Sequence, residues 1–192
     1  MTNQNENVAE ELVKKQEQED LNQKAIFVIE KYPPPESDPF KYTLTEWEAY
    51  KKDPTDFIKQ APTLLPEFMA KGDAKDQEAA LLMIPFVDKE QQIFFIKKGL
   101  KEGKTSAAKM IATGMILELH SFSDQLELVK EAFTESLDKT ERKAVAEVVK
   151  KIFLASGEKD RGSLISTMEK LFADKYIVSG EVQELRAIYE KA

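Results

Sequence analysis

The chain has 192 residues, of which 42% are apolar and 33% are charged, so it is long enough to bury a sizeable core. It contains no cysteine and a single histidine, which excludes disulfides, thiolate metal sites and cysteine nucleophiles. The net charge is −7 and the excess lies in residues 1–20, so the rest of the chain lacks the broad basic surplus typical of nucleic-acid-binding proteins.

Residues 1–20 are polar and acidic, which predicts a disordered or frayed tail. They contain no apolar signal-peptide core, and no apolar stretch of the chain approaches the roughly twenty residues that a membrane span needs. We therefore expect a cytoplasmic protein that makes no membrane contact. An irregular apolar stripe then predicts a helix over about residues 8–31.

Residues 21–61 are expected to form the end of that helix, a proline-rich linker and short helices that pack on the body of the protein. Three consecutive prolines in KYPPPESDPFKY cannot continue a helix and favour an extended conformation. Proline-rich strings with aromatic residues also dock on partner proteins. The candidate protein-interface residues of this stretch are Tyr32, Pro34, Phe40, Tyr42 and Trp47. The alternative is a linker that folds back and buries Phe40 and Trp47.

Residues 62–192 are expected to form an all-helical, repeat-like domain, because strand signals are scarce and apolar residues recur every three or four positions. A short helix over DPTDFIKQ precedes it. The expected helices cover the stretches APTLLPEFMAKG, DAKDQEAALLMIPF, KEQQIFFIKKGLKEG, TSAAKMIATGMILEL, SDQLELVKEAFTES, DKTERKAVAEVVKKIFLAS, RGSLISTMEKLFAD and SGEVQELRAIYEKA.

A weak internal period runs through these helices. Leu65, Met69, Gly72 and Ala80 recur 31 residues later as Ile96, Leu100, Gly103 and Ile111, and Ile93, Ile96 and Leu100 recur 33 residues later as Leu126, Val129 and Phe133. Stacked helical hairpins would bury the apolar faces that a lone hairpin leaves exposed. The pattern is similar to HEAT-type repeats and predicts an all-α array of antiparallel hairpins, an α-solenoid. The alternative is an irregular helical bundle.

The stretch GLKEGKTS, residues 99–106, resembles the end of a phosphate-binding loop. It has three residues between its first glycine and the Gly-Lys-Thr, where the motif needs four, and the preceding residues have a helical period and not that of a buried strand. We therefore expect a turn in which Gly103 ends one helix in the left-handed conformation and Thr105 or Ser106 caps the next.

Charged residues supply the remaining candidates for chemistry. His120 is expected near a helix C-terminus in a structural role, and Glu127, Glu131 and Glu135 form a ladder expected on a solvated helix face. A lysine cluster around one turn could meet phosphates or an acidic partner. That candidate acidic-ligand patch consists of Lys97, Lys98, Lys101, Lys104 and Lys109.

The sequence therefore favours a non-enzymatic adaptor whose helical scaffold binds another protein or a second copy of the chain. We expect no catalytic residues, cofactor or metal. The first alternative is binding of nucleic acid, itself disfavoured by the charge, or of another acidic ligand through the Lys97–Lys109 cluster. The second is an enzyme that uses carboxylates alone.

Overall fold

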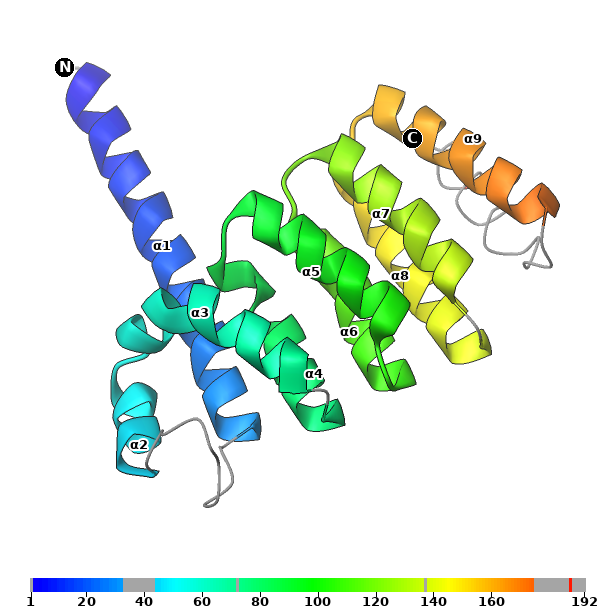
Figure 1. The fold of residues 1–192 in the computed structure, drawn as a ribbon. Helices are drawn as coiled ribbons and strands as arrows, with labels where there is room; N and C mark the ends of the chain where they lie inside the picture. Colours follow the sequence, from blue (N-terminus) through cyan, green and yellow to red (C-terminus); the bar gives the residue numbers. More distant parts are fainter. Residues whose placement is uncertain (1, 33–43, 72, 137, 175–186, 188–192) are drawn as a thin grey trace. The chain divides into compact units, whose positions relative to one another are not determined.

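Every regular element in the described part of the chain is helical, as Figure 1 shows. The structure is a computed structural model, and it describes residues 2–32, 44–71, 73–136, 138–174 and 187. The all-α class expected from the sequence is confirmed. The chain divides into two compact units, residues 1–87 and residues 88–192, and each is described separately below.

The first unit is built around a long N-terminal helix. Its elements are α1 (Thr2–Lys31), α2 (Leu44–Lys52), α3 (Thr55–Lys71), α4 (Ala74–Leu82) and the short 3₁₀ helix η1 (Ile84–Phe86). The second half of α1 packs against α2, α3 and α4 and buries Ala25, Val28 and Ile29. Residues 11–20 of the same helix are all exposed. The helix begins at Thr2, earlier than the expected residue 8.

Helix α3 continues through two prolines, Pro62 and Pro66, where the sequence predicted two separate helices. Each proline removes a backbone donor and disfavours the helical path. Phe57, Leu64 and Leu65 are nevertheless fully buried on this helix, and their packing outweighs the local cost. Residue 62, the expected start of the repeat-like region, therefore lies inside a helix.

The second unit places its helices in two layers. Its elements are α5 (Lys89–Glu102), α6 (Ser106–Met115), the 3₁₀ helix η2 (Ile116–Glu118), α7 (Phe122–Glu135), α8 (Lys139–Ala155) and α9 (Glu158–Asp174). Helices α5, α7 and α9 follow one another in one layer, and α6 and α8 lie side by side in the other (Figure 1). Short turns join α5 to α6 and α7 to α8, so each pair is an antiparallel hairpin.

The same four buried positions recur on α3, α5 and α7. Each set follows the spacing i, i+1, i+4 and i+5, which places all four side chains on one face of the helix. The sets are Leu64, Leu65, Phe68 and Met69 on α3; Phe95, Ile96, Gly99 and Leu100 on α5; and Leu128, Val129, Ala132 and Phe133 on α7. Helix α9 repeats the first three positions with Leu164, Ile165 and Met168.

The second helix of each hairpin repeats with a slightly different period. Thirty-three residues separate the cap Thr105 of α6 from the cap Asp138 of α8, and 32 separate Asp73 of α4 from Thr105. The expected match of Ala80 with Ile111 is therefore wrong by one residue. Ala112, and not the half-buried Ile111, takes the buried position, because the turn before α6 is one residue longer than the turn before α4.

Candidate interaction surfaces

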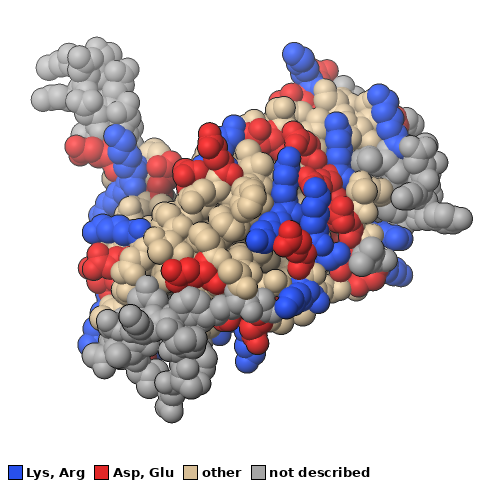
Figure 2. All heavy atoms as spheres, in the orientation of Figure 1, with Lys and Arg blue, Asp and Glu red and all other residues tan. Residues whose placement is uncertain are grey.

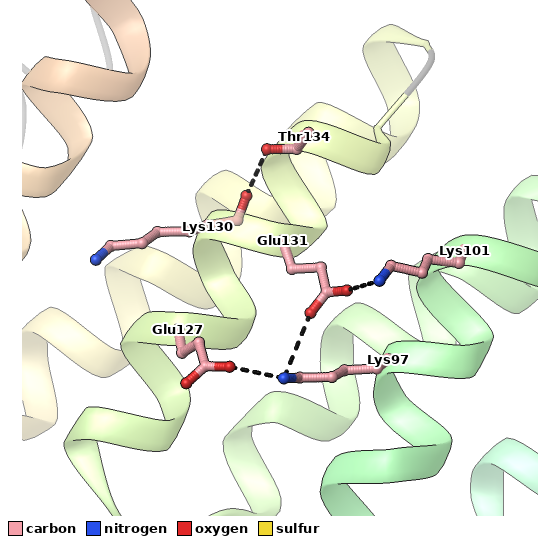
Figure 3. Close-up of polar contacts among 6 residues, drawn as sticks. All are labelled: Lys97, Lys101, Glu127, Lys130, Glu131 and Thr134. Atoms are coloured by element: carbon pink, nitrogen blue, oxygen red, sulfur yellow. Dashed lines mark hydrogen bonds and ion pairs between the residues drawn. The ribbon is translucent and has the colours of Figure 1, made fainter.

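A row of ion pairs joins α5 to α7 on the surface of the second unit (Figures 2 and 3). Lys97 Nζ lies 2.6 Å from Glu127 Oε1 and 3.9 Å from Glu131, and Lys101 Nζ lies 2.7 Å from Glu131 Oε1. Lys130 points away from this row (Figure 3). The carboxylate ladder noted in the sequence thus faces the lysine cluster across two helices.

These contacts occupy much of the predicted acidic-ligand patch. The hydrogen bond to Glu127 raises the pKa of Lys97, and the hydrogen bond to Glu131 raises that of Lys101. Lys109 Nζ donates to the backbone carbonyl of Glu135 at 3.2 Å. The patch therefore has much less free positive charge than its composition suggests. Exposed ion pairs of this kind contribute about 0–1 kcal/mol each, because both side chains remain hydrated.

The two remaining patch residues lie at either end of the turn after α5. Lys98 Nζ is 4.0 Å from Glu102, a long contact within the same helix. Lys104 is exposed between Gly103 and the cap of α6. The five lysines are thus brought to one region, but not as one group of free cations.

The turn that resembles a phosphate-binding loop follows a helix and not a strand. Thr105 caps α6, since its Oγ1 accepts the backbone N–H of Ala108 at 3.0 Å. Ser106 Oγ lies 2.9 Å from a carboxylate oxygen of Asp138 and 2.9 Å from one of Glu141, at the start of α8. Two carboxylates beside the first turn of α6 oppose the approach of an anion.

Gly103 does not adopt the left-handed conformation that we expected. Its φ is −57°, a value open to any residue. The position needs glycine for space, because a Cβ there would lie 2.5 Å from the backbone oxygen of Gly99 and 3.0 Å from Cγ of Lys109. Close packing of the turn against its own helices, and not the backbone angle, explains this residue.

The aromatic candidates of the proline-rich stretch fall mostly outside the described residues. Pro34, Phe40 and Tyr42 lie there, and Trp47 belongs to α2 but its side chain is not described. Tyr32 is 9% exposed, and its hydroxyl donates to Glu78 Oε2 at 2.9 Å. Burial and this carboxylate raise the pKa of Tyr32 well above its ordinary value. Tyr32 therefore contributes to the core of the first unit.

Sequence reasoning missed a basic stripe along α8. Lys139, Lys143 and Lys151 are exposed on the side of this helix opposite its buried residues, with Glu147 among them. None of the three lysines makes an ion pair in the structure, in contrast to Lys97 and Lys101. A helical projection of α8 would have revealed the stripe, whereas the search for charges close in sequence led to the turn after α5.

An uncharged strip on α6 lies beside this basic stripe. Ala107, Met110 and Gly114 are partly exposed at spacings of three and four, so they share one side of α6. Adding 33 to each number gives the exposed positions Thr140, Lys143 and Glu147 of α8, the neighbouring helix in the same layer. We call this surface the α6–α8 face; it consists of Ala107, Met110, Gly114, Lys139, Lys143 and Lys151.

Gly114 leaves open space on the α6–α8 face. A Cβ added at this glycine would meet no atom within 4 Å. Glycine inside a helix is less stable than alanine by about 0.5–1 kcal/mol. Nothing in the described part of the chain requires this glycine, so its flat surface is available for the close approach of another molecule.

The remaining candidates show no catalytic arrangement. His120 is exposed just after η2. Within the described residues no three histidine, aspartate or glutamate side chains gather as a metal site would require, and no helix there has the length and apolarity of a membrane span. No protein-family model, curated protein or solved structure matches the chain.

Proposed function

We propose that this protein is a non-enzymatic interaction module built on a helical-repeat scaffold similar to HEAT-type arrays. The recurrence of the four buried positions on α3, α5 and α7, with α9 repeating three of them, supports this architecture. Repeats of this kind stack their hairpins and present successive second helices on a continuous surface. A cytoplasmic location remains a prediction from the sequence alone.

The α6–α8 face is the proposed binding surface, and one observation carries it: unpaired lysines border a partly apolar strip that is open at Gly114. Partly exposed Met110 can adapt its shape to a partner. Unpaired lysines can gain ion pairs without first breaking existing ones, so electrostatic complementarity can steer an acidic partner. The face thus favours a protein segment that combines acidic and apolar side chains.

The competing lysine patch has weaker support. Lys97, Lys101 and Lys109 already contact groups of the same chain, so a phosphate or acidic ligand would have to displace them. The α6–α8 face needs no such exchange. We therefore favour protein binding at this face over ligand binding at residues 97–109.

A retention experiment with matched variants tests the proposed function. The full-length protein, Gly114→Gln and Lys143→Glu are immobilised and exposed to extract of the cells that produce it. Both substitutions lie on the exposed face, so folding should be unchanged and proteins held by the original chain should be lost. The control Lys159→Glu changes the same charge on α9 and should retain them. Equal retention by all four proteins would show that this face binds nothing.

A further inference from the structure

We propose that the α6–α8 face binds the N-terminal segment, residues 2–20 of α1, from a second copy of this chain. This inference rests on the proposed function of the face and names its occupant. The two surfaces belong to different units of the chain, and each lacks a partner that the other supplies.

The N-terminal segment is an exposed, acidic helix. It carries six acidic residues and two lysines. Leu12 is 62% exposed and Val13 is 57% exposed, although both are large apolar side chains. They are adjacent to Glu11 and close to Glu17, so apolar and acidic groups share a short stretch of helix. Exposed apolar side chains on a helix that packs against nothing along residues 11–20 are typical of an unoccupied binding element.

The segment and the α6–α8 face are complementary in charge and chemistry. The face offers Lys139, Lys143 and Lys151 to carboxylates, and it offers Met110 and the open surface at Gly114 to Leu12 and Val13. The lengths agree as well. Helix α8 has 17 residues and residues 2–20 lie in one helix, which correspond to about 25 Å and about 28 Å at 1.5 Å per residue.

The rest of α1 holds the segment ready for such a contact. Ala25, Val28 and Ile29 anchor the second half of the helix in the first unit, and the helix continues without a break back to Thr2. A preformed helix loses less conformational entropy on binding than a disordered tail would. The contact joins two different surfaces, so two copies that exchange their segments form a closed dimer with two equivalent contacts.

Sedimentation velocity of full-length proteins tests this inference. Variant A carries Leu12→Lys and Glu17→Lys and has a disrupted segment. Variant B carries Lys143→Glu and Lys151→Glu and has a disrupted face. The original chain should dimerise with rising concentration and dissociate with added salt, since the contact is largely electrostatic. Each variant alone should dimerise at least about tenfold more weakly, because it loses both ion pairs and apolar contact.

An equimolar mixture of A and B should restore dimers, because the segment of B still meets the face of A. The control carries Lys159→Glu and Lys170→Glu on α9, which gives the same charge change as B, and should dimerise like the original chain. Circular dichroism establishes that every variant is folded. A monomeric original chain, or a mixture that fails to form dimers, would overturn the inference. The proposed function fails separately, when Gly114→Gln and Lys143→Glu retain every protein that the original chain retains.

Discussion

The hydroxyl of Ser106, in the first turn of α6, lies 2.9 Å from the carboxylate of Glu141, which is only 5% exposed in the first turn of α8. This contact ties together the N-terminal ends of two helices that are 33 residues apart in the repeat. It shows that the serine of the phosphate-loop-like stretch has a structural partner. Since both helices start at this point, they run side by side in the same direction.

Ser106→Ala should destabilise the second unit by about 1–3 kcal/mol, because the substitution removes a donor from two carboxylates, one of them buried. Urea unfolding followed by circular dichroism measures the loss. Ser163→Ala, which removes an exposed hydroxyl bonded to a carbonyl of its own helix, is the control and should have little effect. Equal stability of the two variants would show that the contact between α6 and α8 contributes nothing.

Gly103→Ala should also destabilise the protein, by about 1–3 kcal/mol, because the new methyl group must displace the backbone at Gly99. Alanine can adopt the observed φ of −57°, so the effect is one of space and not of backbone strain. The same urea titration measures it. A variant as stable as the original chain would mean that the turn after α5 relaxes freely.

Gly114→Ala should have the opposite sign and stabilise the fold by about 0.5–1 kcal/mol, since alanine favours the helix and its Cβ meets no atom. A shift of the unfolding midpoint to higher urea concentration is the expected result. Destabilisation would show that the glycine is needed within the chain, which would remove the main reason to assign it to binding.

The unfolding free energy should fall as the pH drops below about 4. Backbone N–H groups and the Ser106 hydroxyl lower the pKa of Asp138 from 3.8, and the ammonium of Lys89 lowers that of Asp124. A lowered folded-state pKa contributes stability above the unfolded value of 3.8, and the contribution is lost as the pH falls through the folded value. Urea titrations between pH 2 and pH 6 measure this, and Asp138→Asn should flatten the dependence.

Much of the fold could be predicted from the sequence because apolar spacing and helix caps are local signals. The stretches expected for α7 and α8 match the observed helices within a residue or two, and the pairing of Ile96 and Leu100 with Val129 and Phe133 is confirmed by their burial. The continuation of α3 through Pro62 was not foreseeable, since packing of distant residues outweighs the local preference of proline.

The candidate site was harder to predict, because it depends on which charges meet across helices. The sequence places Lys97 and Lys101 in an apparent cationic patch, and only the fold brings Glu127 and Glu131 against them. The lysines of α8 are further apart in sequence and line up only on the helix surface. Burial of Tyr32 likewise depends on its contact with Glu78, 46 residues away.

Photo-crosslinking from Gly114 tests most directly whether the α6–α8 face binds protein. A benzophenone side chain is placed at Gly114, or at Gly157 as the control, because an added Cβ meets no atom at either position. After irradiation in the producing cells, a discrete protein adduct should form from Gly114 and not from Gly157. Adducts equal at both positions, or none at Gly114, would contradict the assignment of this face.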